Sequence, residues 1–278
     1  MVDAADQRAK AVRFGALHRR AGAFVMPNPW DAGSARVLTS LGFEALATSS
    51  GALAVTLGRR DGRVSRDQVL AHAAALVAAS DLPVSADLEN GYGDRPETVA
   101  ETVRLAAEVG LVGGSIEDAA SDGARAIYEL SHAIERVAAA VAAARALPFP
   151  FLVTARAENY LRGRPDLDDT IRRLQAFAAA GADVLYAPNL PDLATVRAVC
   201  QSVSQPVNVM VGAKGQCFPV DALAAAGVRR ISLGPTLLRV ALSAVIGAVR
   251  DIRERGSFEF GEAAISFGAL DQTMADRP

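Results

Sequence analysis

The sequence predicts an α/β protein made of one (β/α)8 barrel of the TIM type. A helix-like run rich in alanine, a glycine and a short β-branched segment recur in this order, as in RLAAEVGLVGGSIED and QAFAAAGADVLYAPN. The glycine of each repeat stands where a helix ends in a left-handed cap. The chain is 278 residues long, and this length together with the repeats fits one undivided barrel. The four capping glycines are Gly42, Gly110, Gly181 and Gly227.

The eight expected strands are short apolar runs rather than alternating ones, which indicates that both of their faces are covered. AFVMPN begins at residue 23, and the second strand closes the run VLTSLGFEALATSS. Two strands open with proline after a short linker, LPVSADLE and QPVNVMVG. The remaining four are LVGGSIED, FPFLVTARAE, ADVLYAPN and VRRISLG. An open doubly wound sheet is the alternative, but no GxGxxG follows the first strand, which disfavours dinucleotide binding.

Residues 1–255 are expected to form the barrel, because no linker or change of composition interrupts them. The helix-like segments between strands carry apolar residues three and four apart, as in DQVLAHAAALVAAS. Residues 256–278 form a C-terminal tail that contains Phe258, Phe260 and Phe267. An apolar tail of this kind is expected to pack on the barrel or on a partner subunit.

Composition excludes several classes of function. A net charge of −2 argues against binding to nucleic acid or to an anionic membrane. Cys200 and Cys217 form neither a disulfide framework nor a metal-binding spacing. The charged segment MVDAADQRAKAVRF does not resemble a signal peptide, and no apolar run is long enough to span a membrane. We therefore expect a cytoplasmic protein.

Polar side chains gather at the predicted carboxyl ends of the strands, where barrel enzymes carry their active groups. Asp87, Glu89 and Glu117 follow two adjacent strands and should meet on one rim. Three carboxylates so close together need either a nearby cation or a raised pKa in at least one of them. Oxygen ligands suit Mg²⁺ or Mn²⁺. A rim of salt bridges without metal is the alternative.

Arg156 directly follows the apolar strand FLVTA, and its planar fork suits a substrate carboxylate. A structural pair with Glu158 or Glu117 is the alternative. The small residues Ser49, Ser50 and Gly51 offer backbone N–H groups to a second anionic group, although such turns are common. Further candidates for substrate contact at strand ends are Trp30, Asn189 and Asn208.

The segment GALAVTLGRRDGR, residues 51–63, is long for a connection and contains Asp61, so it is either a lid or a plain surface loop. The histidines fall in helix-like runs, which disfavours a zinc site or a Ser-His-Asp triad. They are His18, His72 and His132.

In order, the motifs NPWDAGSAR, TSSG, LGRRDG, ADLENGYG, SIED and TARAE resemble the isocitrate lyase/phosphoenolpyruvate mutase superfamily from about residue 24 to 240. Members are Mg²⁺-dependent barrels, commonly dimers of dimers that swap the last helix, and they form an enolate of a 2-oxo acid. The resemblance implies that Asp87 binds the metal directly and that Glu89 and Glu117 hold metal-bound waters. Glu89 departs from the family's commoner aspartate.

The same resemblance implies that Asp61 is a catalytic lid residue, that Arg156 grips the substrate carboxylate, and that Ser49, Ser50 and Gly51 bind the oxo-acid end. In isocitrate lyases a cysteine loop follows the fourth strand, whereas here the segment reads AASDGARAIYELSHAIERV, without cysteine. Efficient cleavage of isocitrate or methylisocitrate is therefore not expected.

The expected activity is cleavage of a C–C bond in a small 2-oxo or 2-hydroxy carboxylate. One alternative is a phosphonomutase or phosphonopyruvate hydrolase, although the segment also lacks the mutases' Asn-Ser. A Schiff-base aldolase would have to use Lys214, since the only other lysine is Lys10 in a polar segment. A barrel that binds 2-oxo acids without turnover is the last alternative.

Overall fold

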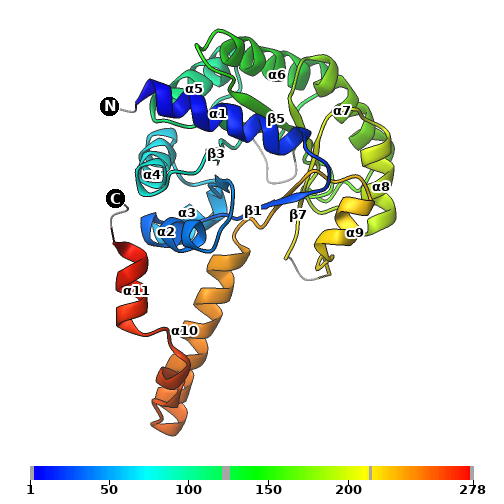
Figure 1. Cartoon of the computed structure of the whole chain (residues 1–278). Helices are drawn as coiled ribbons and strands as arrows, with labels where there is room; N and C mark the ends of the chain where they lie inside the picture. The colour runs from blue at the N-terminus through cyan, green and yellow to red at the C-terminus, as the bar shows by residue number, and fades with distance from the viewer. Residues whose placement is uncertain (1–2, 121–125, 213–214, 276–278) are drawn as a thin grey trace.

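The computed structural model describes residues 3–120, 126–212 and 215–275. Its eight strands are parallel and lie in the order β1-β8-β7-β6-β5-β4-β3-β2. The amide of Ala47 donates a hydrogen bond of 3.1 Å to the carbonyl of Pro27, which links the β2 and β1 ends of this order. The predicted barrel is confirmed in a nearly closed form (Figure 1).

Every strand lies inside a segment that the sequence predicted. The strands are β1 (Phe24–Met26), β2 (Leu46–Ala47), β3 (Val84–Asp87), β4 (Gly113–Glu117), β5 (Leu152–Arg156), β6 (Val184–Tyr186), β7 (Val207–Met210) and β8 (Arg230–Ser232). The helices that surround them are α1 (Ala4–Arg19), α2 (Ala32–Ser40), α3 (Ser50–Thr56), α4 (Arg66–Ala79), α5 (Pro96–Glu108), α6 (Leu130–Arg145), α7 (Leu167–Ala179), α8 (Leu193–Gln201), α9 (Val220–Ala225) and α10 (Thr236–Arg255).

The helix-ending glycines of the repeat adopt the left-handed backbone that the sequence predicted. Their φ angles are 83° at Gly42, 96° at Gly110, 97° at Gly181 and 104° at Gly227. A side chain would strain each of these positions, because L-residues rarely adopt positive φ. The glycines thus end helices α2, α5, α7 and α9 so that the chain can turn into the next strand.

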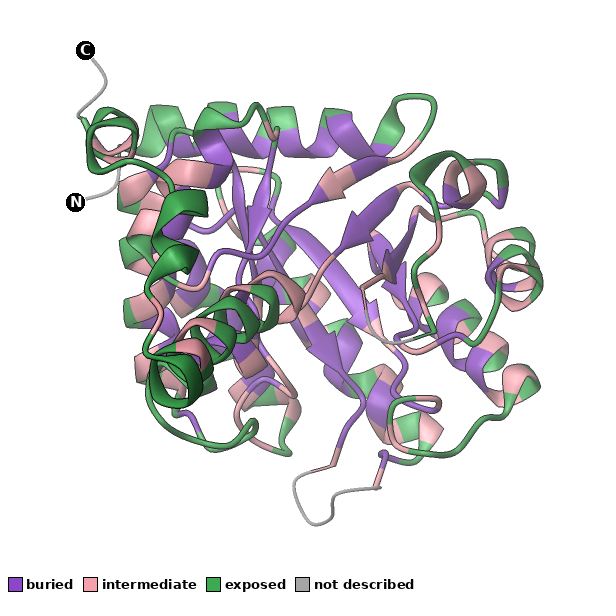
Figure 2. Cartoon of the chain, turned by 90° about the horizontal axis from the view of Figure 1, so that it is seen from below, coloured by how far each residue is buried: buried purple, intermediate pink, exposed green. Residues whose placement is uncertain are grey.

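Helix α1 covers the end of the barrel at which the strands begin. Its buried Phe14 and Leu17 pack against Phe24, Leu152 and Val184 at or near the starts of three strands. The strands themselves are buried, whereas the outer faces of the surrounding helices are exposed (Figure 2). The opposite end, where the strands finish, is left for the site.

The C-terminal segment leaves the barrel and then returns to it. Helix α10 projects outward and ends at Arg255, and a short 3-10 helix, η1 (Glu259–Ala263), precedes α11 (Phe267–Met274) (Figure 1). Arg36 of α2 donates a hydrogen bond of 2.6 Å to the carbonyl of Met274, so α11 contacts α2 of the same chain. In the described part of the chain, no helix is long and apolar enough to cross a bilayer.

Candidate active site

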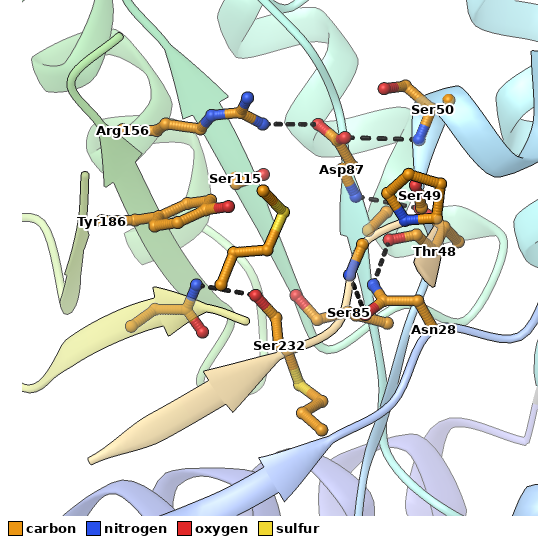
Figure 3. Close-up of a pocket in the computed structure, with 18 of the residues that line it drawn as sticks. Asn28, Thr48, Ser49, Ser50, Ser85, Asp87, Ser115, Arg156, Tyr186 and Ser232 are labelled. Carbon is orange, nitrogen blue, oxygen red and sulfur yellow. Dashed lines mark hydrogen bonds and ion pairs between the residues drawn. The ribbon is translucent and has the colours of Figure 1, made fainter. Parts of the chain in front are cut away.

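A cavity of about 210 Å³ opens among the strand ends (Figure 3). Most of the residues that the sequence singled out for catalysis or substrate binding line this one cavity. They are Ser49, Ser50, Gly51, Asp61, Asp87, Arg156 and Asn208. Because they come from four different strands or the segments that follow them, only the closed sheet brings them together.

Asp87 ends β3 and is held in place by backbone groups. Its Oδ2 accepts a hydrogen bond of 3.3 Å from the amide of Ser50, and its Oδ1 accepts one of 3.2 Å from the amide of Glu89. The hydroxyl of Thr48 accepts a hydrogen bond of 2.9 Å from the amide of Asp87. The carboxylate therefore has a fixed orientation beside the turn that opens α3.

The turn after β3 is tightly constrained. Glu89 has a φ of 47°, an unusual backbone for this residue type. A Cβ on Gly91 would lie 2.9 Å from the side chain of Val99, so only glycine fits there. Buried Arg136 donates a hydrogen bond of 2.7 Å to the carbonyl of Gly93 and also contacts the carbonyls of residues 90 and 94. The ENGYG sequence thus fixes where Glu89 lies.

Arg156 forms ion pairs with neighbouring carboxylates. From the sequence, such a structural pairing is the alternative to substrate binding. Its Nε lies 2.5 Å from Glu158 Oε1, and its Nη1 lies 3.2 Å from Glu117 Oε2 and 3.8 Å from Asp87 Oδ1. Arg162 pairs with the same two glutamates, at 3.3 Å from Glu117 and 3.1 Å from Glu158. Arg156 also lines the cavity, so these pairs leave its role in substrate binding open.

This cluster carries more negative than positive charge. Among the described residues, Asp87, Glu89, Glu117 and Glu158 face the guanidinium groups of Arg156 and Arg162, which leaves two negative charges in excess when all are ionised. Burial, with the negative charges of Asp87 and Asp61, raises the pKa of Glu89 to about 7. Burial also raises the pKa of Glu117 well above its ordinary value, although Arg156 opposes this.

The residues present fit a divalent cation. Glu89 Oε1 is buried without a hydrogen-bond partner, and the charge excess is two. Among the described residues, no three acidic, histidine or cysteine side chains converge closely enough to ligate one ion together. An ion that keeps several waters, as Mg²⁺ prefers, would need only one direct protein ligand here.

Asp61 lies over the cavity beside Gly51. A Cβ on Gly51 would be 3.4 Å from Asp61 Oδ2, so the carboxylate rests against this glycine. The segment 51–63, expected to be either a lid or a surface loop, is helical in its first part, which belongs to α3. Ser49 caps this helix by accepting a hydrogen bond of 3.3 Å from the amide of Ala52, and alanine and leucine favour the helix.

Other predicted residues lie elsewhere. Trp30 and Asn189 do not line the cavity, and the carbonyl of Trp30 instead contacts the ring of His72 at 3.0 Å. Glu89 and Glu117 lie beside the cavity rather than on its wall. Lys214 lies outside the described residues. The histidines are on α1, α4 and α6, as expected.

Sequence reasoning missed several cavity residues because it considered only strand ends. Side chains of one strand face the same way every second residue, so the positions two before an end also point inward. This rule finds Ser85 behind Asp87 and Ser115 behind Glu117. It also finds Arg230 behind Ser232. All of them line the cavity, as does Tyr186, whose ring stacks 5.1 Å from the Arg156 guanidinium.

Comparison with known proteins places these residues in a family. The family model for phosphoenolpyruvate phosphomutase matches residues 14–253. The chain belongs to the isocitrate lyase/phosphoenolpyruvate mutase superfamily. It is an enzyme of this superfamily's carbon–carbon lyase and mutase type.

Three relatives of this superfamily cover most of the chain. A structure from Burkholderia cenocepacia J2315, described as a candidate lyase/mutase, is 54% identical over 98% of both chains, with a TM-score of 0.96. An uncharacterised protein from Mycobacterium tuberculosis is 32% identical and covers 87% of this chain and 89% of its own. A 2-methylisocitrate lyase from Halalkalibacterium halodurans is 27% identical, over 92% of this chain and 86% of its own.

Proposed function

We propose that this protein is a Mg²⁺-dependent lyase that cleaves a C–C bond in a small 2-oxo or 2-hydroxy carboxylate through an enolate. The observation that carries the proposal is the two-charge negative excess around Asp87, with the unpartnered Oε1 of Glu89, at the rim of a small cavity. Mn²⁺ satisfies the same oxygen ligands. Similarity to 2-methylisocitrate lyases and to an oxaloacetate decarboxylase from Marinomonas sp. supports the reaction class.

Asp87 would hold the ion directly, and Glu89 and Glu117 would accept hydrogen bonds from its waters. A bound divalent cation supplies positive charge that stabilises a developing enolate oxygen. The protein's own part is to orient and enclose the substrate. The turn Ser49–Gly51 lies beside Asp87 and faces the cavity, where its backbone can position the oxo-acid end.

Arg156 would bind the substrate carboxylate from the opposite wall of the cavity, since its guanidinium lies on the cavity and is oriented by Glu158 and Glu117. Asp61 would close over the bound substrate from its place against Gly51 and exclude water. The residue that protonates the enolate is not among the cysteines, because Cys200 and Cys217 do not line the cavity.

A screen of 2-oxo and 2-hydroxy acids with Mg²⁺, read as release of pyruvate or glyoxylate, tests this function. We expect turnover of at least one C4–C6 acid that stops in excess chelator. Full activity in excess chelator would contradict the proposed dependence on a metal. If every acid binds but none is turned over, the protein would be a binding barrel without catalysis.

A second candidate is cleavage or rearrangement of a P–C bond, which the match to the phosphoenolpyruvate phosphomutase model favours. Phosphonopyruvate in the same screen separates the two, because only a P–C enzyme releases phosphate or phosphoenolpyruvate from it. The absence of Asn-Ser after Glu117-Asp118 favours the lyase.

The exposed face of α10 supports association with a second copy of the chain. Val245 is 57% exposed and Ile246 is 51% exposed, and Val240 and Val249 add to this apolar surface. We expect a homo-oligomer, a dimer of dimers as the resemblance implies. Light scattering should show a mass that falls in the variant Val245→Asp and stays unchanged in the control Val12→Asp, whose side chain is exposed on α1.

A further inference from the structure

The floor of the cavity carries a buried positive charge whose partners in the described part of the chain are neutral. Arg230 begins β8 and is 3% exposed, yet it lines the cavity. Its Nε donates a hydrogen bond of 2.8 Å to Asn208 Oδ1, and its Nη2 donates one of 3.0 Å to Thr154 Oγ1. Within the described residues, no carboxylate forms an ion pair with it.

The third partner of Arg230 is a neutral histidine. His18 Nδ1 lies 2.8 Å from the carbonyl of Phe14, which can only accept, so Nδ1 carries the ring proton. The other nitrogen, Nε2, then accepts from Arg230 Nη1 at 3.3 Å. Burial, and after it the charge of Arg230, lowers the pKa of His18 to about 3, so the ring adds no charge at neutral pH.

The guanidinium keeps unused hydrogen-bonding capacity. It has five N–H groups, and the acceptors on Asn208, His18 and Thr154 account for three of them. A buried charge without a counter-charge costs several kcal/mol. Burial lowers the pKa of Arg230 to about 10, which still leaves it charged at neutral pH. An anion on the floor of the cavity would remove this cost.

Small hydroxylated residues leave room for that anion. Barrel interiors are usually filled by bulky branched side chains. Here β3, β4 and β8 contribute Ser85, Ser115 and Ser232 to the cavity instead. Ser85 is 4% exposed, and both Ser85 and Ser115 line the cavity. Figure 3 shows these serines around the space below Asp87 and Arg156.

We propose that the floor of the cavity is a second anion subsite, in which Arg230, with the hydroxyls of Ser85 and Ser115, binds the distal carboxylate of a short dicarboxylic substrate. The inference rests on the proposed function, which places the 2-oxo acid end of that substrate at Asp87 and Arg156. It adds the requirement that the substrate be a dianion. A planar carboxylate suits the two remaining N–H groups of a guanidinium.

The test compares oxaloacetate with 4-methyl-2-oxopentanoate, in which an isopropyl group replaces the distal carboxylate at similar size. Dissociation constants are measured by calorimetry with Mg²⁺ on the full chain. We expect the wild type to bind the dicarboxylate at least tenfold more tightly. In Arg230→Gln the two constants should approach one another within about threefold, because the charge that separates them is gone.

Ser115→Ala provides a second variant that leaves the partners of Arg230 intact. It removes one hydroxyl from the floor without filling it, so it should weaken oxaloacetate about tenfold without weakening 4-methyl-2-oxopentanoate. A purely structural role of Arg230 would weaken both ligands equally, which would overturn the subsite. Tighter binding of phosphonopyruvate than of oxaloacetate would overturn the assignment to a carboxylate.

The two proposals fail differently. The apolar ligand carries only the 2-oxo acid end, so its Mg²⁺-dependent binding tests the proposed function alone. Equal affinity of the wild type for both ligands overturns the subsite and leaves the lyase function standing. Absence of Mg²⁺-dependent binding by either ligand overturns the lyase function and the subsite with it.

Discussion

The two ends of the cavity have opposite electrostatic character. At the mouth, four carboxylates outnumber the guanidinium groups of Arg156 and Arg162, whereas at the floor Arg230 donates, among the residues the structure describes, to neutral acceptors. Both imbalances are buried, and both would be relieved by ligands of opposite charge: a divalent cation above and an anionic group below. Under the two proposals, the difference would let the cavity take a ligand that chelates metal at one end and carries negative charge at the other.

The largest effect is expected at the mouth. Asp87→Asn removes one ligand charge at constant size, so Mg²⁺-dependent activity should fall by roughly 10³-fold. The melting temperature should hold or rise, because repulsion among the carboxylates is relieved. Activity assays and thermal melts check both parts, with the exposed Glu97→Gln as control. Normal activity in Asp87→Asn would show that the mouth does not hold a catalytic metal.

A large negative result is expected with isocitrate. The segment after Glu117-Asp118 lacks the cysteine acid, and a positioned general acid contributes about 10²–10⁴-fold in rate. The kcat/KM for isocitrate and methylisocitrate should stay below about 10⁴ M⁻¹s⁻¹. Steady-state kinetics alongside an accepted oxo acid measure this, and a higher value would mean that another group supplies the proton.

Arg156→Lys should have a smaller effect, since it keeps the charge but loses the planar fork. We expect substrate affinity to fall by about 2 kcal/mol, roughly 30-fold. Calorimetry with a 2-oxo acid and Mg²⁺ measures the loss, and the exposed Arg95→Lys is the matched control. Unchanged affinity together with a lower melting temperature would assign Arg156 to the ion-pair network alone.

The smallest effect is a pH dependence of stability at the floor. The pKa of His18 is lowered by burial to about 3 in the folded protein, so the unfolded chain takes up its proton first as pH falls below 6.5. Stability from neutral His18 is therefore complete above pH 6.5 and declines toward pH 3, by about 1.4 kcal/mol at pH 5.5.

Urea unfolding at pH 7.5 and 5.5 measures this loss. The variant His18→Gln, which cannot be protonated, should lose less stability between the two values than the wild type. The control His132→Gln, on a partly exposed ring, should behave as the wild type does. Equal losses in the wild type and His18→Gln would mean that the floor tolerates a second positive charge.

Several features were predictable from sequence because they depend on local chemistry. The glycines at 42, 110, 181 and 227 mark helix ends through backbone freedom alone, and eight apolar runs between helices allow few folds other than a barrel. Strand ends then indicate which residues meet at the mouth, because parallel strands finish on one rim. The carboxylates at 87, 89 and 117 follow from this rule.

Tertiary structure alone decided the pairings among those residues. From the sequence, Arg156 could pair either with a substrate carboxylate or with Glu117 or Glu158. Arg162, which bridges the same two glutamates, lies in a loop whose path no sequence periodicity indicates. The floor was also hidden, because strands buried on both faces show no alternation that distinguishes the inward residues. Arg230, His18 and Thr154 lie far apart in the chain and meet only when β8, α1 and β5 converge at the base of the barrel, where burial makes each missing counter-charge significant.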